Sequence, residues 1–339
     1  MIENKSVAVV IPCYRVEKQI GPLLARIPSY VDRVFVIDDA SPDATAAAVS
    51  AVADPRITLL RHGQNRGVGG AMATGYRAAL DARANFIVKV DGDGQMDPRD
   101  IETLLRPLVE ERAEYAKGCR FHDADSLHAM PRVRFAGNIG LTFLTKLASG
   151  YWHVLDPQNG FVAIDAPTLA RLRLDQLARG YFFENDMLLR LNAIEARVAD
   201  VPLPTRYGDE TSSLKPGRIA LEFPFRLMIG LFRRIYWRYV FYDVSPIALF
   251  VLFGLALFLF GVVFGAYHWI TNAIRGVATP TGTVFLAAVP FILGFQLLLQ
   301  AIVLDIQNTP RAPSRKTVRP QSDTEHAPPL DRESRIGRV

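Results

Sequence analysis

The stretch "VKVDGDGQMDP" places three carboxylates within seven residues, at Asp91, Asp93 and Asp97. Carboxylates this close repel one another, so the arrangement needs a cation to stabilise it. Two carboxylates and the side-chain oxygen of Gln95 are ligands that Mg²⁺ or Mn²⁺ accepts, and these hard ions bridge diphosphates. Asp97 stands directly before a proline, which is typical of a helix start. We therefore expect a metal site at Asp91, Asp93 and Gln95, and a helix cap at Asp97.

A calcium loop is the alternative, because Asp91, Asp93 and Glu102 match positions 1, 3 and 12 of an EF-hand. Met96 stands where that loop needs glycine, and the preceding "FIVKV" is strand-like where an EF-hand needs a helix. The sequence therefore favours a metal turn at the end of a strand.

Residues 1–214 alternate strand and helix patterns. Strands are expected at 7–11, 34–37, 57–61, 86–90 and 115–118, and helices at 17–26, 43–52, 68–82 and 98–110. This alternation predicts an α/β domain with a mostly parallel, doubly wound, Rossmann-like sheet. Ligands of such sheets bind at the carboxyl ends of the strands, and four polar turns follow the first four strands. They are "PCYRVEKQI", "DDASPD", "QNRGVGGAMATGYRAAL" and "DGDGQMDP".

The glycines of "NRGVGGAMATGYRAAL" fall where a loop enters a helix. Such a loop can cradle a phosphate, but the stretch matches neither the P-loop nor the dinucleotide-binding pattern. Close packing of the helix on the sheet through small residues is the alternative, and the sequence leaves both open.

Two apolar stretches follow, 247–267 and 281–304, of 21 and 24 residues without a charge. Each is long enough to cross a hydrocarbon core of about 30 Å as a helix. Buried helices of a soluble domain are the alternative. We expect a two-helix transmembrane region over 246–306 and a disordered tail over 307–339, which is rich in proline, serine and charge.

Residues 215–242 hold six basic residues against Glu222 alone, whereas residues 1–214 hold 25 basic and 27 acidic residues. The basic excess therefore adjoins the apolar stretches, which favours anionic lipid headgroups over nucleic acid as its partner. We expect amphipathic helices at the membrane interface over 215–245, with packing on the catalytic domain as an alternative that does not exclude it. The loop between the spans carries only Arg275, so the positive-inside rule places both termini in the cytoplasm.

Only Cys13 and Cys119 are present, which argues against a disulfide scaffold and fits a reducing compartment. The first apolar run, "SVAVVIPCY", is short and follows a charged start, so we expect a buried strand rather than a signal segment.

Taken in order, the motifs "VVIPCY", "VIDDAS", "NRGVGGA", "VDGDGQMDP", "KGCRF", "DPQNGFVAI", "YFFENDMLLRL" and "RYGDETSSLK" resemble inverting glycosyltransferase family 2 with the GT-A fold. Within it they are most similar to the polyprenyl- and dolichyl-phosphate sugar synthases. The resemblance implies a nucleotide-sugar donor, a polyprenyl-phosphate acceptor, Mg²⁺ or Mn²⁺, and the bacterial inner (cytoplasmic) membrane. Family members of this shape are often tetrameric, so a homo-tetramer is expected.

The resemblance also assigns residues. It implies a donor-binding set of Pro12, Tyr14, Glu17, Asp38, Asp39, Arg66, Gly67, Asp91, Asn159, Gly160, Glu184, Arg206 and Lys215. Within this set the first three line the base pocket, Asn159 and Gly160 shape the sugar pocket, and Arg206 and Lys215 face the diphosphate. It implies a catalytic set of Asp93, Asp186, Arg120 and Arg134, in which the arginines grip the acceptor phosphate.

Glu184 and Asp186 are assigned to sugar hydroxyls or to a base. Solvent-facing carboxylates in the first turn of a helix are the alternative for this pair.

"DGDGQMDP" and "DPQNGF" differ from the eukaryotic mannose synthases, so neither the sugar nor the base, uracil or guanine, is assigned. Three alternatives to a polyprenyl-phosphate sugar synthase stay open. One is a family 2 transferase with a glycolipid acceptor. The second is a processive polysaccharide synthase, which usually has more spans and a Q-x-x-R-W-type motif that this sequence lacks. The third is a non-catalytic sugar-nucleotide-binding membrane protein.

Overall fold

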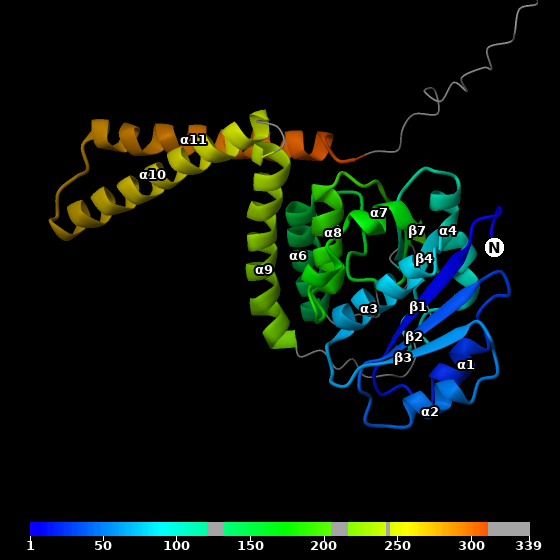
Figure 1. The fold of residues 1–339 in the computed structure, drawn as a ribbon. Coiled ribbons are helices and arrows are strands. Elements are labelled where there is room, and N and C mark those ends of the chain that lie inside the picture. The colour runs from blue at the N-terminus through cyan, green and yellow to red at the C-terminus, as the bar shows by residue number, and fades with distance from the viewer. Residues whose placement is uncertain (121–131, 205–215, 242–244, 311–339) are drawn as a thin grey trace, which may run out of the picture.

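The computed structural model describes residues 1–120, 132–204, 216–241 and 245–310, which form an α/β domain, flanking helices and a long helical hairpin (Figure 1). The strands of the sheet are β1 (Val7–Cys13), β2 (Arg33–Asp38), β3 (Ile57–Arg61), β4 (Phe86–Lys89), β5 (Tyr115–Cys119), β6 (Val162–Asp165) and β7 (Val198–Pro202). The five expected strands correspond to β1–β5, and each predicted start and end lies within two residues of the observed one. The sequence did not predict β6 and β7.

The sheet order is β3-β2-β1-β4-β6-β5-β7. Neighbouring pairs among β1–β4 are parallel, as are β5 and β7, whereas β6 runs antiparallel to both β4 and β5. The predicted mostly parallel sheet is thus confirmed with one reversed strand. Because β6 is reversed, the residues that enter it, Asn159 and Gly160, lie at the edge where the other strands end.

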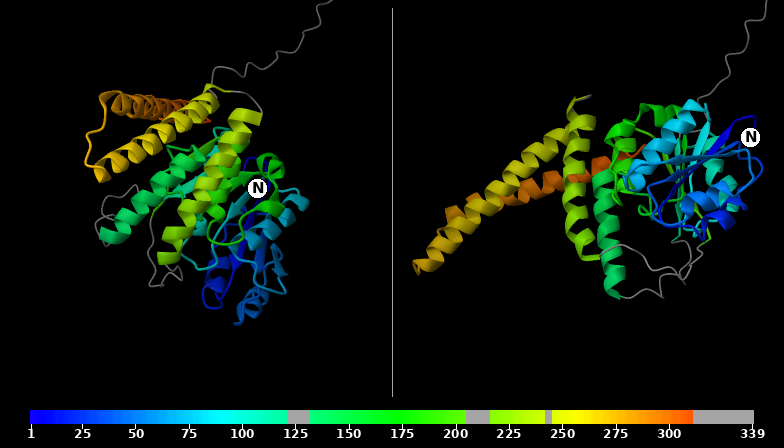
Figure 2. Two further views of the ribbon diagram at one scale, coloured as in Figure 1. Left: turned by 90° about the vertical axis from the view of Figure 1, so that its left-hand side faces the viewer. Right: turned by 60° about the horizontal axis from the view of Figure 1, so that its bottom comes forward.

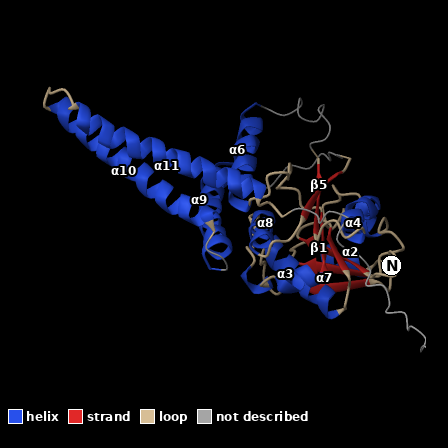
Figure 3. Ribbon diagram, turned by 90° about the horizontal axis from the view of Figure 1, so that it is seen from above, coloured by secondary structure: helices blue, strands red, loops and turns tan. Residues whose placement is uncertain are grey.

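Helices cover both faces of the sheet (Figures 1 and 3). One face packs on α1 (Ile20–Leu24), α2 (Thr45–Ser50) and α4 (Ile101–Val109), which follows the short 3₁₀ helix η1 (Pro98–Asp100). The other face packs on α3 (Val68–Asp81), α7 (Ala166–Arg171) and α8 (Phe183–Ala193). Buried side chains of Tyr76, Met72 and Leu188 fill this second layer.

Two further helices, α6 (Arg132–Ser149) and α9 (Pro216–Tyr236), lie side by side along the domain (Figure 2). Their inner sides pack against α8 and the residue before it. The apolar cluster between them is formed by Ala148, Phe182, Leu189, Phe223 and Leu227. A short π-helix, η3 (Trp237–Phe241), continues α9.

The outer sides of these helices and of η3 carry exposed apolar side chains. We call this set the apolar face: Ile139, Phe143, Phe225, Met228, Ile229, Phe232, Tyr236, Trp237 and Phe241. Helix α9 therefore packs on the domain with one side and presents apolar residues to the surroundings with the other, so the two interpretations of 215–245 are compatible.

The hairpin consists of α10 (Pro246–Ile274) and α11 (Thr281–Gln307), two helices long and apolar enough to cross a membrane. The most apolar 18-residue stretches of α10 and α11 have a mean hydropathy of 2.9 and 2.1. Only 22% and 11% of these stretches are buried. This exposure argues against the alternative of buried helices in a soluble domain. The helices approach closely through glycines, since a Cβ on Gly261 would lie 2.6 Å from the Phe291 nitrogen.

Helix α11 continues through Gln307, and Asn308 to Pro310 are ordered against the domain. The rest of the expected disordered tail lies outside the described residues.

Candidate active site

The polar turns meet at one edge of the sheet, as predicted. The Asp39 amide donates to the Cys13 carbonyl at 2.9 Å, which joins the ends of β2 and β1. The turn after β4 touches the end of β1, because a Cβ on Gly92 would lie 2.9 Å from the Cys13 sulfur. Parallel strands place these ends together, so residues from four separate turns form one site.

Asp39 organises the glycine loop rather than facing solvent. Its buried carboxylate accepts from the Arg66 amide at 2.9 Å and from the Gly67 amide at 2.7 Å. The Nδ1 atom of His62, which sequence reasoning missed, lies 2.6 Å from Asp39 Oδ1. Asp38 is buried beside it and accepts from the Ser41 amide at 3.0 Å. Donor binding by Asp38 and Asp39 stays a prediction; the family resemblance implies that Asp39 contacts the base or ribose.

The glycine loop is packed against the segment before α8. Gly67 has a φ of +76°, and a Cβ there would lie 2.4 Å from the Arg179 carbonyl oxygen. A Cβ on Gly69 would lie 1.8 Å from the Ala178 carbonyl oxygen, and on Gly75 it would lie 2.2 Å from a methyl group of Val10. Close packing therefore accounts for these three glycines, while phosphate binding by the loop stays a prediction.

Asp186 supports that same segment. Its Oδ2 accepts from the Ala178 amide at 2.9 Å and from Arg190 Nε at 2.8 Å. The side chains of Asp186 and Glu184 are only 14% and 12% exposed, so the alternative of solvent-facing carboxylates is wrong. These contacts favour positioning of the 178–180 backbone over proton removal as the role of Asp186.

Lys89, in the middle of the sheet, joins three parts of the site. Its fully buried Nζ lies 2.5 Å from Asp91 Oδ1, 3.3 Å from Glu184 Oε1 and 3.2 Å from the Gly160 carbonyl oxygen. An ammonium has three donors, and here each has an oxygen partner. Although burial lowers the pKa of Lys89, the Asp91 and Glu184 carboxylates raise it overall above its usual value. One cation therefore holds two carboxylates close together at the edge.

Gly160 has to be small for this arrangement. A Cβ there would lie 2.4 Å from Lys89 Nζ and 2.5 Å from Asp91 Oδ2. The residue predicted to shape the sugar pocket thus also admits the contact between Lys89 and Asp91.

Lys117 on β5 repeats the motif on the other side of β6. Lys89 and Lys117 both pair with Val162 of β6, so the three side chains share one face of the sheet. Lys117 Nζ donates to the Asn159 carbonyl oxygen, and burial lowers its pKa to about 8. Sequence reasoning missed both lysines, although a lysine inside an apolar strand requires a buried partner.

The four residues predicted to bind phosphates differ in how far the structure describes them. Arg120 is 41% exposed and its Nε lies 2.7 Å from Oδ2 of the buried Asp156. Arg134 belongs to α6, whereas Arg206 and Lys215 lie outside the described residues. Gripping of a phosphate by these residues stays a prediction.

The predicted base pocket lies at the ends of β1 and β2. Pro12 is in β1, and Tyr14 follows it with 45% of its surface exposed. Glu17 Oε2 accepts from the Ala44 amide at 3.0 Å, which ties the turn after β1 to the turn after β2. An exposed aromatic ring at this edge is suited to stacking on a nucleotide base.

The predicted donor set for a divalent cation is Asp91 and Asp93 with Gln95. Asp91 is 29% exposed on its side chain, Asp93 is partly buried and Gln95 is exposed. Among the described residues no three His, Cys, Asp or Glu side chains are grouped to hold a metal. The set still fits, because Mg²⁺ is usually bound by one or two carboxylates together with substrate phosphates. Asp97 caps η1 through the Arg99 amide, as expected.

The comparisons with known proteins agree with this geometry. Residues 8–171 match the model of glycosyl transferase family 2. A protein of Methanocaldococcus jannaschii without an assigned function is 31% identical over 213 residues, 62% of this chain and 86% of the relative.

Several relatives carry functional names. UDP-N-acetylglucosamine–dolichyl-phosphate N-acetylglucosaminyltransferase of Methanococcus voltae is 29% identical over 60% of this chain and 87% of its own length. Undecaprenyl-phosphate mannosyltransferase of Micrococcus luteus is 29% identical over 58% and 82%.

Among solved structures, glucosyl-3-phosphoglycerate synthase from Mycobacterium tuberculosis, in complex with Mn²⁺ and UDP, superposes with a TM-score of 0.51. It is 20% identical, and the match covers 68% of this chain and 80% of that one, which shows the GT-A fold alone. The chain belongs to glycosyl transferase family 2 and is a glycosyltransferase.

Proposed function

We propose that the protein transfers a hexose from a UDP- or GDP-linked sugar to a polyprenyl phosphate, with inversion at the anomeric carbon. The transfer takes place at the cytoplasmic face of a bacterial inner membrane, in which the hairpin is embedded. The names of the relatives from Methanococcus voltae and Micrococcus luteus support this acceptor class.

The observation that carries the proposal is the position of the apolar face. Helix α6 follows β5 and helix α9 follows β7 in the chain. The carboxyl ends of both strands lie at the edge of the sheet that carries the candidate site, which we call the catalytic edge. Helix α9 runs from that side of the domain to the hairpin (Figures 1 and 2). An apolar face of this kind inserts into the headgroup region of a bilayer. The exposed Arg226 and Arg233 on α9 would attract anionic lipids. A soluble acceptor requires none of these features.

The chemistry follows from the acceptor. An oxygen of the lipid phosphate attacks the anomeric carbon from the face opposite the nucleotide diphosphate, and the bond from that carbon to the diphosphate oxygen breaks. A phosphate monoester has a second pKa of about 6, so it is largely ionised at neutral pH and needs no strong base. This agrees with an Asp186 carboxylate that is already engaged by Ala178 and Arg190.

The protein's residues bind and orient the reactants. Asp91 and Asp93 with Gln95 would hold Mg²⁺ or Mn²⁺, which when bound offsets the negative charge of the diphosphate. Lys89 keeps Glu184 at the edge, where the carboxylate can accept from sugar hydroxyls. Arg120 with Arg134, and Arg206 with Lys215, would bind the acceptor phosphate and the diphosphate.

Transfer of label tests the proposal. Membranes that contain the protein are incubated with Mn²⁺ and radiolabelled UDP- or GDP-hexoses, and we expect label in a lipid fraction that mild acid hydrolyses. A screen of nucleotide sugars for thermal stabilisation with Mn²⁺ selects the donor. Label found only in a long polymer would instead indicate a polysaccharide synthase, and absence of transfer from every sugar that binds would indicate a binding protein.

Asp93→Ala tests the metal assignment. We expect transfer to fall by at least about 100-fold, because an electrostatic contact to developing charge is lost. Asp81→Ala, an exposed carboxylate at the last residue of α3, is the matched control and should retain activity. Full transfer by Asp93→Ala would contradict the assignment.

Membrane orientation is tested with Ala278→Cys in the exposed turn between the two spans. We expect an impermeant maleimide to label this residue from outside intact spheroplasts, whereas the buried Cys13 and Cys119 of the unchanged protein should not react. Labelling only after lysis would reverse the orientation.

A further inference from the structure

The end of the second apolar helix carries a buried acid. Asp305 follows directly on the apolar stretch 281–304 and is only 7% exposed. A buried carboxylate is strongly unfavourable unless a cation and hydrogen bonds compensate it. Its partners therefore indicate what this end of the helix is built to contact.

Arg234 of α9 provides the compensation. Its guanidinium, 3% exposed, binds both oxygens of Asp305, with Nη1–Oδ1 at 2.7 Å and Nη2–Oδ2 at 3.0 Å. Tyr239 of η3 donates its hydroxyl to Asp305 Oδ1 at 2.7 Å. A two-point contact of this kind fixes an angle as well as a distance.

The same guanidinium is bound to the catalytic domain. Its Nε donates to the Ala148 carbonyl oxygen at 2.7 Å and Nη2 to the Leu147 carbonyl oxygen at 3.2 Å, both at the end of α6. Gly150, with a φ of +74°, leaves room for it, since a Cβ there would lie 2.6 Å from Nη1. Arg234 therefore joins α6, α9 and α11 in one buried contact.

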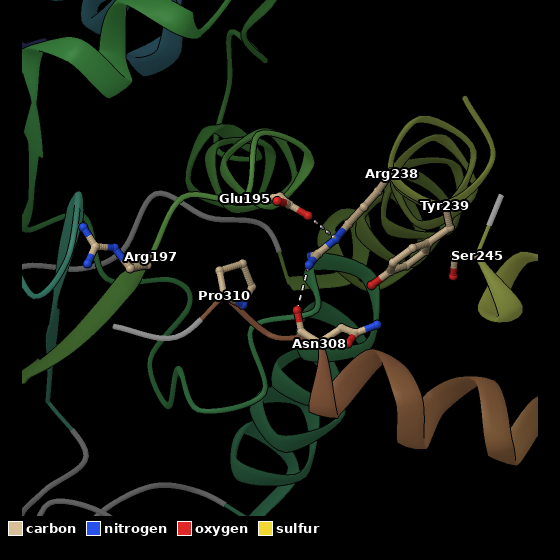
Figure 4. Close-up of a pocket in the computed structure, with 7 residues that line it drawn as sticks. All are labelled: Glu195, Arg197, Arg238, Tyr239, Ser245, Asn308 and Pro310. Atoms are coloured by element: carbon tan, nitrogen blue, oxygen red, sulfur yellow. Dashed lines mark hydrogen bonds and ion pairs between the residues drawn. The ribbon is translucent and has the colours of Figure 1, made fainter. Parts of the chain in front are cut away.

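Neighbouring contacts reinforce this attachment beside a polar pocket of about 500 Å³. Figure 4 shows Arg238 between Glu195 and Asn308, and its Nη2 donates to the Asn308 carbonyl oxygen at 2.7 Å. The Thr309 hydroxyl donates to the Gly150 carbonyl oxygen at 3.0 Å. The chain that leaves α11 is thus held to the domain over several residues.

The two helices of the hairpin behave as one body, because glycines bring their backbones into contact. A Cβ on Gly294 would lie 2.3 Å from the Phe258 nitrogen, and on Gly254 it would lie 3.1 Å from the Gly294 carbonyl oxygen. An attachment that fixes the end of α11 therefore fixes the direction of the whole hairpin relative to the domain.

We propose that Arg234 and Asp305 are positioning residues that dock the membrane hairpin on the catalytic domain at a fixed angle, and so set the depth at which the catalytic edge meets an acceptor held in the bilayer. This rests on the proposed function. The pair touches no reactant, and it acts through the orientation of α9 and of the apolar face.

The test compares two acceptors with the full-length protein. The double variant Arg234→Met/Asp305→Leu replaces the ion pair by apolar residues, an exchange that proteins often tolerate without loss of stability. Transfer is measured to a long-chain polyprenyl phosphate in vesicles and to a short, water-soluble prenyl phosphate. We expect kcat/KM to fall by about 10- to 100-fold with the vesicle acceptor, the scale of a small misplacement of reactants, and to stay unchanged with the soluble one.

The matched control is Glu110→Leu/Arg112→Met, which removes an exposed ion pair of 2.6 Å just after α4 that makes no contact with Arg234 or Asp305. It should change neither activity. An equal fall with both acceptors in the junction variant, or no fall with either, would overturn the positioning role.

A second measurement is independent of catalysis. A fluorophore on Phe225→Cys, at a position 69% exposed on the apolar face, is quenched by lipids brominated at known depths. We expect the double variant to change the depth of strongest quenching, and an unchanged depth would contradict docking. If the unsubstituted protein transferred sugar to neither prenyl phosphate, the proposed function would fail, and this depth comparison would still decide the positioning role.

Discussion

Two buried cations, Lys89 in the sheet and Arg234 at the hairpin junction, solve the same electrostatic problem differently. Each joins segments that are remote in the chain through carboxylates. Lys89 faces two acids, Asp91 and Glu184, whereas Arg234 faces Asp305 alone. One ammonium with two carboxylates leaves negative charge at the site, and one guanidinium with one carboxylate leaves a neutral contact.

Exposure separates the two clusters further. The side chain of Asp91 is 29% exposed, while that of Asp305 is 9% exposed and bound on both oxygens. Excess charge that is partly open to solvent suits binding of a cation or of sugar hydroxyls. A closed and neutral pair suits a fixed joint. We therefore expect the same pairing of buried ions to serve chemistry in one place and architecture in the other.

The largest effect is expected from Lys89→Met. Without the ammonium, Asp91 and Glu184 repel, and both move from their positions at the edge. We expect kcat/KM for sugar transfer to fall by about 100-fold or more. The double variant Lys89→Met/Glu184→Gln removes the repulsion, so it should recover thermal stability without recovering activity. Recovery of both would mean that Lys89 only compensates charge.

At the hairpin junction we expect a single substitution to affect stability more than the chemistry of transfer. Arg234→Met leaves Asp305 buried and unpaired, which should lower the free energy of unfolding in detergent by about 3–5 kcal/mol. Replacing Asp305 by leucine as well should restore most of this loss. A denaturant titration of the single and double variants measures it, and additive losses would show that the two residues are not coupled.

Gly160→Ala should have a smaller effect that falls on the site alone. The added methyl group would lie 2.5 Å from Asp91 Oδ2, so the backbone or the carboxylate has to shift. Overpacking of this kind costs about 1–3 kcal/mol. We expect weaker binding of the nucleotide sugar in a calorimetric titration, and Gly137→Ala, where the structure leaves open space, is the control. Equal binding by Gly160→Ala would show that the edge is more adaptable than the structure indicates.

The smallest effect concerns Lys117, whose pKa burial lowers from 10.5 to about 8. Between these values the unfolded chain holds a proton that the folded protein has released, so this residue's contribution to stability rises with pH. The slope is at most about 1.4 kcal/mol per pH unit. We expect the stability of the unsubstituted protein relative to that of Lys117→Met to increase from pH 8 to pH 10. A constant difference would mean that Lys117 is not perturbed.

Much of the catalytic domain could be predicted, because local patterns specify it. Buried parallel strands read as short apolar runs, and polar turns after them predict the edge at which Asp39 and Asp91 lie. Asp97 before Pro98 specifies a helix start within three residues, and the structure has it. The apolar stretches likewise specify the hairpin helices by length alone.

The reversed strand β6 and the role of Asp186 could not be predicted. Four residues, Val162–Asp165, carry too little pattern to reveal direction, which depends on pairing with β4 and β5. Asp186 is placed in the first turn of a helix by sequence, but its contact with Ala178 depends on how the chain folds back.

By itself the sequence determined a family 2 glycosyltransferase domain, its carboxylate-rich edge and two apolar helices. Only the tertiary structure decided which partners the buried charged side chains contact. Lys89 lies 71 residues from Gly160, and Arg234 lies 71 residues from Asp305, so no local spacing could pair them. Periodicity reports whether a side chain faces the core, whereas the partner of a buried charge is set by the packing of whole elements.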